Sequence, residues 1–249
     1  VGVAEQNMVT VATGLALSGK NVFIYAILSF MTMRCYEQIK FNICSMNLPI
    51  TLIGLGSGLS FEFDGPSHHG VGDIGIMRML PEMTIYNPSS PAVAKAVAQM
   101  AYDSDSPVCV RLDKGKMDPL YNTGANFKEG LGVLREGKDI CIVSTGTMVH
   151  RALQVAEILA DHSISATVVD LYCLKPVNEK LLLKCLLPFT RVVTLEDNSI
   201  IGGLGTILSE TLTDNEQTTK LKRIALLDEQ CLRYGQKEWL HETYQIDVP

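Results

Sequence analysis

The stretch LPITLIGLG at residues 48–56 gives the clearest sign of the fold, because it is an aliphatic run of strand length that ends in glycines. A strand that is apolar on both faces is typical of a parallel sheet with helices on both sides. Two further runs have this character, and segments with helical periodicity alternate with them. In chain order, these strands and helices are 7–18, 21–27, 48–56, 91–102 and 107–115. This alternation predicts an α/β domain.

The second half of the chain repeats the plan after an irregular polar stretch at 116–128. Amphipathic helices are expected between further strands at 139–146, 164–176, 191–197 and 221–228. The sequence therefore predicts an α/β fold of two three-layer domains with mostly parallel sheets, residues 1–118 and 119–249. The first domain is expected to lack its N-terminal part, since no strand and helix precede Glu5.

Composition and charge narrow the class of protein. The chain has 249 residues, of which 47% are hydrophobic and 19% charged, a balance with ample material for a core. Its net charge of -6, without a basic run, argues against nucleic acid or an anionic membrane as partner. Seven cysteines without a C-x-x-C pair predict buried thiols in a reducing, cytoplasmic setting and no zinc site. No apolar run reaches the roughly 18 residues of a membrane span.

The loop after the strand expected at 48–56 is the first candidate site. It contains D-G-P-S-H-H-G at 64–70, and ligands of open α/β sheets bind beyond the carboxyl ends of the strands. His68 and His69 are therefore candidates for proton transfer or for hydrogen bonds to a substrate. The alternative is a pair of surface histidines without a role. A metal site is not expected, because adjacent residues rarely both ligate.

A second glycine-rich loop precedes the helix expected after residue 203. Glycines occur at positions 202, 203 and 205, so the helix N-terminus could bind an anion. The spacing does not match G-x-G-x-x-G, which argues against a dinucleotide site. A tight turn with close helix packing is the favoured interpretation.

Glu5 is the remaining candidate, because it directly precedes an apolar helix. A carboxylate at this place stabilises the helix dipole, which is the simplest interpretation. Its apolar neighbours, including Val3, Ala4 and Met8, favour a second one. A carboxylic acid in apolar surroundings has a raised pKa and can remain protonated as a hydrogen-bond donor.

Together these segments resemble the transketolase family of thiamine-diphosphate enzymes. The resemblance rests on GVAEQNMVTVATGLALSGKNVF (2–23), FMTMRCYEQIKFNIC (30–44), DGPSHHG (64–70), VVDLYCLKPV (168–177) and VVTLEDNSIIGGLG (192–205), in this order. It covers nearly the whole chain and implies a pyrimidine-binding domain followed by a transketolase C-terminal domain. The D-G-P-S-H-H segment favours transketolase or 1-deoxyxylulose-phosphate-synthase chemistry over the beta subunits of 2-oxo-acid dehydrogenases.

The resemblance implies thiamine diphosphate as cofactor and gives Glu5 a role. In the family this glutamate hydrogen-bonds a ring nitrogen of the aminopyrimidine, so Glu5 is expected to be a proton donor. Phe30 would stack on the same ring. Ile27 and Met33 stand where the family has further aromatic residues, which makes this cofactor pocket apolar but poor in rings.

The substrate residues also follow from the resemblance. His68 matches a histidine that contacts the donor sugar near its reacting carbons, and Asp64 matches an acid that contacts its hydroxyls. A sugar phosphate would meet Lys114, where the family usually has arginine, with Arg111 three residues earlier. A lysine binds phosphate as a point charge and not as a planar fork. Asn198 stands where relatives often carry histidine and is assigned no role.

The metal segment of the family, Gly-Asp-Gly … Asn, does not occur in these 249 residues. The Mg²⁺ ligands are therefore expected from a partner, an N-terminal diphosphate-binding subunit, and no metal ligand is expected in this chain. The length and the end after YQIDVP favour a subunit of a split transketolase over a fragment of a long one. A second copy of this chain is expected in a heterotetramer.

The implied activity is transfer of a two-carbon ketol unit between sugars or sugar phosphates, and only with the partner present. Two alternatives stay open. One is an acyloin synthase of the 1-deoxyxylulose-5-phosphate type, which uses pyruvate as donor. The other is a non-catalytic, transketolase-like scaffold subunit. The lack of aromatic residues in the cofactor pocket and the presence of Lys114 favour this alternative.

Overall fold

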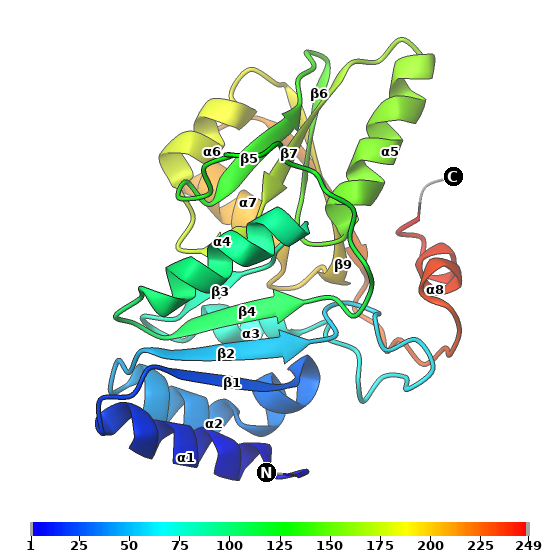
Figure 1. Ribbon diagram of the computed structural model, residues 1–249. Helices are drawn as coiled ribbons and strands as arrows, with labels where there is room; N and C mark the ends of the chain where they lie inside the picture. The colour runs from blue at the N-terminus through cyan, green and yellow to red at the C-terminus, as the bar shows by residue number, and fades with distance from the viewer. Residues whose placement is uncertain (1, 248–249) are drawn as a thin grey trace.

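A computed structural model describes residues 2–247 and shows two five-stranded sheets, each between layers of helices (Figure 1). The predicted lack of an N-terminal part of the first domain concerns a region outside the described residues. The first sheet has the order β1-β2-β4-β3-β8, in which the first four strands are parallel and β8 is antiparallel. Its strands are β1 (Val22–Ile27), β2 (Ile50–Leu55), β3 (Thr84–Tyr86), β4 (Val108–Leu112) and β8 (Cys173–Lys175). The strand expected at 48–56 is thus β2, paired on both sides.

Helices cover both faces of this sheet. On one face, α1 packs against β1 and against the helical stretch that follows it; on the other, α4 packs its valines against β4. Ser90 accepts a hydrogen bond from Val93 N at the start of α4, as an N-cap does. The helices of this half are α1 (Glu5–Leu17), α2 (Tyr36–Gln38) between π-helical turns at Phe30–Arg34 and Ile39–Cys44, α3 (Asp73–Arg78) and α4 (Pro91–Tyr102).

The second sheet has the order β10-β9-β6-β7-β5, again parallel except for one edge strand, β5. Helix α5 packs on one face, while α6 and α7 pack on the other. The strands are β5 (Leu131–Arg135), β6 (Ile140–Ser144), β7 (Ala166–Leu171), β9 (Arg191–Ser199) and β10 (Lys220–Leu226). The helices are α5 (Met148–Asp161), α6 (Glu179–Leu186), α7 (Leu204–Asp214) and α8 (Lys237–Thr243).

The predicted fold class, two three-layer α/β domains with mostly parallel sheets, is confirmed. One strand prediction is wrong, because the run 164–176 is not a single strand. The chain leaves the second sheet after β7 and adds β8 to the first sheet, antiparallel to β3. Tyr172, at the crossing point, packs beneath α4. The two halves therefore share a sheet as well as a core.

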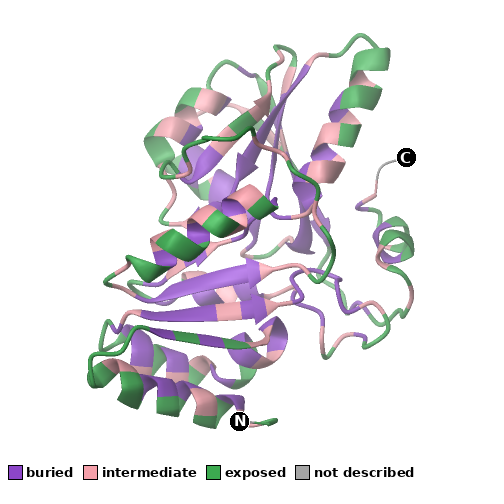
Figure 2. Cartoon of the chain, viewed as in Figure 1, coloured by how far each residue is buried: buried purple, intermediate pink, exposed green. Residues whose placement is uncertain are grey.

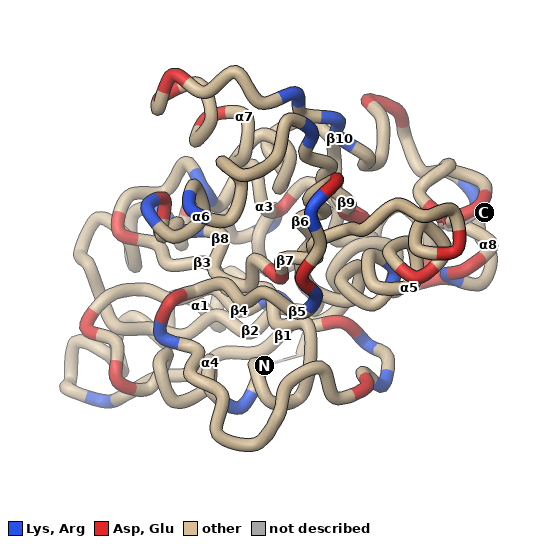
Figure 3. The backbone as a smooth tube through the Cα atoms, turned by 90° about the horizontal axis from the view of Figure 1, so that it is seen from above, with Lys and Arg blue, Asp and Glu red and all other residues tan. Residues whose placement is uncertain are grey.

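Burial follows this plan. The central strands of both sheets are buried almost throughout, whereas edge strand β1 leaves Phe23 and Tyr25 exposed (Figure 2). All seven cysteines are free, and all but Cys185 are buried. Lysine and arginine alternate with aspartate and glutamate along the chain, without an extended basic tract (Figure 3). No helix among residues 2–247 has the length and apolarity of a membrane span.

A buried carboxylate, Asp170, lies where the two halves meet. It accepts hydrogen bonds from Ser89 and from Tyr121, at 2.7 Å for the latter. Burial raises the pKa of Asp170 to about 7, although both hydrogen bonds act to lower it. The ordinary pKa of an aspartate is 3.8. Between this pH and about pH 7, the folded chain therefore holds a proton on Asp170 that the unfolded chain has lost. Asp170 therefore costs stability as the pH rises through this window.

We expect the free energy of unfolding to fall between pH 5 and pH 8 by less in Asp170→Asn than in the parent chain. The asparagine keeps the size of the side chain but cannot acquire a buried charge. Urea unfolding at both pH values measures this, with exposed Asp161→Asn as the matched control. Equal falls in Asp170→Asn and the parent would show that Asp170 does not titrate in this range.

Candidate functional site

Glu5 is the first residue of α1, and its carboxylate forms an ion pair with Arg34. The distance from Arg34 Nη1 to Glu5 Oε2 is 2.7 Å. The Glu5 side chain is 11% exposed and that of Arg34 is 42% exposed, so the pair lies at the surface with its acid turned inward. Helix α1 and the turn at Phe30–Arg34 hold the two partners together.

The expectation that Glu5 has a raised pKa is wrong for this chain. A hydrogen bond from its own backbone N–H lowers the pKa, burial opposes this, and the hydrogen bond and charge of Arg34 lower it further. Glu5 is therefore an anion at neutral pH. The apolar neighbours that suggested otherwise do not enclose it, since Val3 is 86% exposed.

Four of the predicted site residues, Glu5, Phe30, His68 and Lys114, belong to one continuous series of contacts. The Arg34 guanidinium lies over the Phe30 ring, 4.4 Å from its centroid. Phe30 meets the His68 ring edge-on at a centroid distance of 4.7 Å. The centroids of the His68 and Phe61 rings are 5.5 Å apart, and Lys114 Nζ lies 4.9 Å from the centroid of the Phe61 ring.

This series connects residues that are far apart in the sequence. Glu5, Phe30, His68 and Lys114 come from the start of α1, the turn after β1, the loop after β2 and the end of β4. Because β1, β2 and β4 are adjacent parallel strands, their carboxyl ends meet at one edge, where ligands of such sheets bind. Half-buried Ile27, the last residue of β1, lies at the same edge.

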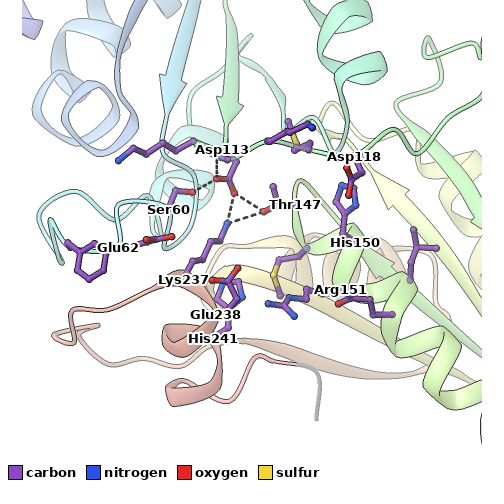
Figure 4. Close-up of a pocket in the computed structure, with 18 of the residues that line it drawn as sticks. Ser60, Glu62, Asp113, Asp118, Thr147, His150, Arg151, Lys237, Glu238 and His241 are labelled. Atoms are coloured by element: carbon purple, nitrogen blue, oxygen red, sulfur yellow. Dashed lines mark hydrogen bonds and ion pairs between the residues drawn. The ribbon is translucent and has the colours of Figure 1, made fainter.

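A cleft of about 830 Å³ continues from this edge toward the second half of the chain (Figure 4). Asp64 and Lys114, two of the predicted substrate residues, line it. Its other walls come from the loop 113–118, the first turns of α5 and the helix α8. Asp64 is exposed, so its carboxylate is accessible to a ligand in the cleft.

Arg111 does not take part in this surface, which corrects its predicted role in phosphate binding. Its side chain is 1% exposed. The guanidinium donates from Nε to Asp73 Oδ2 at 2.5 Å and from Nη2 to Asp73 Oδ1 at 3.1 Å. Asn198, which has no role in the sequence-based prediction, donates to Asp73 Oδ1 and to Gly70 O. Arg111 therefore lies buried behind the loop that carries His68, where it supports that loop through Asp73. It cannot contact a substrate.

His69 differs from its neighbour, because it is 2% exposed. Neither ring nitrogen has a hydrogen-bond partner among the described residues, and burial lowers the pKa of His69. The imidazole is therefore neutral at physiological pH. Of the two candidate histidines, the loop presents His68 to a ligand and buries His69.

The Glu196 side chain occupies the position that an external anion would take at the glycine-rich loop 202–205. The Glu196 carboxylate accepts hydrogen bonds from Leu204 N at 2.7 Å and Gly205 N at 2.8 Å. These are free N–H groups at the start of α7. Burial raises the pKa of Glu196 to about 7. The tight-turn interpretation is the correct one, and this helix end has no room for an external ligand.

Sequence reasoning missed four residues of the site region. Arg34 and Phe61 link the predicted residues to one another, and Asp113 and Lys237 form an ion pair on the wall of the cleft. The F-x-x-x-R spacing at 30–34 was a usable signal, since these positions are neighbours on a helix. The distance in sequence between Asp113 and Lys237 offered none.

The residues at the sheet edge suit an aminopyrimidine ring. Such a ring presents hydrogen-bonding nitrogens at its rim and an aromatic face. The structure provides a carboxylate with one oxygen bound to Arg34 and, beside the same arginine, the ring of Phe30. The described residues offer no comparable site for a metal ion. Residues 2–247 contain no group of three or more His, Cys, Asp or Glu that could hold one.

Comparison with known proteins gives the same two-part division. Residues 1–119 match the family described as transketolase, pyrimidine binding domain, and residues 131–249 match transketolase, C-terminal domain. An apulose-4-phosphate transketolase subunit of Actinobacillus succinogenes is 32% identical over 100% of this chain, which covers 80% of that protein. The 6-deoxy-6-sulfo-D-fructose transketolase subunit SqwH of a Clostridium species is 35% identical over 99% of the chain, with 76% of that protein covered.

Two further comparisons bear on function and fold. The 1-deoxy-D-xylulose-5-phosphate synthase of Crocosphaera subtropica is 36% identical over 92% of the chain, but the chain spans only 36% of its length. A solved structure described as a split gene transketolase, inactive beta4 tetramer, has a TM-score of 0.87 and 32% identity. The match covers 99% of this chain and 78% of that one.

Proposed function

This chain belongs to the transketolase family, and we propose that it is the pyrimidine-binding and C-terminal subunit of a split transketolase, active only with a diphosphate-binding partner subunit. One observation carries the proposal: Glu5, Phe30 and His68 lie in a single series of contacts at the carboxyl edge of the sheet. Relatives of similar extent are named as transketolase subunits. The reaction is transfer of a two-carbon ketol unit between sugars or sugar phosphates.

Glu5 serves in this proposal to hold a proton against a ring nitrogen of thiamine diphosphate, which supplies the electron sink for the reaction. In the chain alone, the hydrogen bond from its own backbone N–H and the ion pair with Arg34 keep Glu5 ionised. An ionised carboxylate accepts hydrogen bonds but cannot donate one. Glu5 therefore becomes a donor only when closure of the site makes the cost of burying its charge larger than these stabilising interactions, as burial favours the neutral acid. The partner subunit provides that closure.

His68 and the cleft bind the sugar. The His68 ring is held between Phe30 and Phe61, and its Nδ1 lies 2.9 Å from the Ser67 hydroxyl. This leaves Nε2 to exchange a proton with the reacting hydroxyl or to donate a hydrogen bond to it. Asp64 accepts hydrogen bonds from sugar hydroxyls, and Lys114 offers a point charge to an anionic sugar tail.

In this proposal the partner subunit supplies the Mg²⁺ ligands, as the family's Gly-Asp-Gly … Asn segment does not occur in these 249 residues. A second copy of this chain completes a heterotetramer. Support comes from the structural relative described as an inactive beta4 tetramer of a split gene transketolase. In that description, the self-associated chain is a tetramer and is inactive.

One alternative has specific support. The relatives include 1-deoxy-D-xylulose-5-phosphate synthases at 33–36% identity, so pyruvate is a candidate donor. The purified complex with its partner subunit, given an aldose phosphate as acceptor and either pyruvate or a ketose phosphate as donor, separates the two functions. We expect consumption of the ketose and none of the pyruvate. Consumption of pyruvate alone would establish the synthase, and consumption of neither would leave the scaffold function.

A further inference from the structure

The loop that carries His68 rests on the C-terminal segment of the chain, residues 227–247. Leu59 of the loop packs into a cluster with Cys231, Leu240 and Ile246 of that segment. The backbone also joins them, since Gly235 N donates to Glu62 O at 3.3 Å. The loop is therefore not free at the sheet edge but leans on an element from the far end of the sequence.

An ion-pair network underlies this contact (Figure 4). Lys237, the first residue of α8, pairs with Asp113 and lies 3.5 Å from Asp197 Oδ2. Its Nζ also donates to Thr147 Oγ1 at 3.2 Å, and the Thr147 hydroxyl donates to Asp113 at 2.8 Å. The other oxygen of Asp113 accepts from the Ser60 hydroxyl at 2.7 Å. The network thus joins the loop after β2, the end of β4, the start of α5, β9 and α8.

The charged groups of the network stabilise one another's ionised forms. Burial alone would raise the pKa of Asp113, but Lys237, together with the hydrogen bonds of Ser60 and Thr147, lowers it to about 2. Burial would lower the pKa of Lys237, yet Asp197 and Asp113 raise it. Asp113 and Lys237 are therefore both charged at neutral pH. Lys237 provides the ammonium that faces both Asp113 and Asp197, and removing it leaves the buried charge of Asp113 without its ion-pair partner.

The network ends next to the predicted substrate residues. Ser60 precedes Phe61, whose ring lies between His68 and Lys114. Asp113 precedes Lys114, and its Oδ1 also accepts from Gly115 N at 3.1 Å. A shift of Asp113 would therefore move the loop 113–118 and, through Ser60, the loop that presents His68. Phe30 touches the loop through the His68 ring, and Glu5 is further removed, beyond Arg34.

We propose that Lys237 is a positioning residue: through Asp113 and Ser60, the C-terminal helix fixes both loops that bind the sugar. This inference rests on the proposed function for the assignment of those loops. It places control over sugar binding in the second half of the chain, although the sugar-binding residues lie in the first. A misplacement of about 1 Å in such loops can cost on the order of 10²-fold in rate.

The test is Lys237→Met in the full chain, assembled with its partner subunit. We expect KM for the ketose to rise by about tenfold or more, with the dissociation constant of thiamine diphosphate unchanged. Lys237→Arg keeps the charge and should restore most of the affinity for the ketose. Exposed Lys180→Met is the control and should leave both constants unchanged.

Hydrogen exchange of the chain without its partner provides a measurement that does not need activity. We expect faster exchange at residues 57–70 and 113–118 in Lys237→Met, with exchange in α1 unchanged. Ser60→Ala leaves the ion pairs intact and removes the hydrogen bonds of Ser60 to Asp113 and to Ser57 O, so its effect on exchange at 113–118 tests the proposal if Lys237→Met fails to fold. Unchanged exchange and unchanged KM in Ser60→Ala and in folded Lys237→Met would refute the positioning role. Altered exchange in a complex that acts on no ketose would instead refute the proposed function.

Discussion

Replacing Glu5 with alanine is expected to lower kcat of the assembled complex by about 10²–10⁴-fold, the range typical of a lost acid–base group. The reason is that the proposed donor to the cofactor ring disappears, while Phe30, His68 and the cleft remain. Steady-state turnover of a ketose phosphate at saturating thiamine diphosphate measures the effect. Stability should change little, because the lost ion pair with Arg34 lies partly at the surface.

Two control variants sharpen this result. Glu37→Ala removes an exposed carboxylate from the next helix and should leave kcat unchanged. Arg34→Met removes one cause of the low pKa of Glu5, so the pKa of Glu5 in the chain alone should rise. Turnover by Glu5→Ala equal to that of the parent would contradict the assigned role and leave the scaffold function standing.

Replacing Arg111 with methionine is expected to destabilise the chain by about 3–5 kcal/mol, because it leaves the Asp73 charge buried without its partner. Asp73 and Arg111 are each 1% exposed in their side chains, so water cannot replace the lost interaction. Urea unfolding of the chain at neutral pH measures the loss. The same substitution at exposed Arg191 should change the free energy of unfolding by no more than about 0.5 kcal/mol.

A double variant distinguishes a lost ion pair from lost packing. Asp73→Asn combined with Arg111→Met removes both charges, and we expect it to recover most of the stability that the single variant loses. A double variant as unstable as Arg111→Met would show that the shape of the arginine, and not its charge, supports the loop.

Much of the fold could be predicted from the sequence, because apolar runs of strand length such as 48–56 are typical of a parallel sheet that helices cover on both faces. The exceptions are elements whose place depends on a distant partner. The run 164–176 is mostly apolar and gives no sign of where β7 ends and β8 begins. Strand β5, with a glycine at position 132, and the polar helix α8 lack the periodicity on which the predictions relied.

The site was predictable in part for the same reason. Glu5 and His68 stand out because each lies in an unusual local setting, and parallel strands bring their ends together. The ionised state of Glu5 agrees with its place at a helix start, where its own backbone N–H lowers its pKa, but its ion pair with Arg34, a residue on a different helix, could not be predicted. The burial of Arg111 likewise depends on Asp73, which only the folded loop brings to it.

The proposal that this chain is one half of a divided enzyme is tested by turnover of a ketose phosphate with thiamine diphosphate and Mg²⁺. The rate is measured for this chain alone and for its complex with the diphosphate-binding subunit. We predict no turnover by the chain alone and cofactor-dependent transfer of the two-carbon unit by the complex. Turnover by the chain alone, or a complex that binds the cofactor but acts on no ketose, would contradict the proposal.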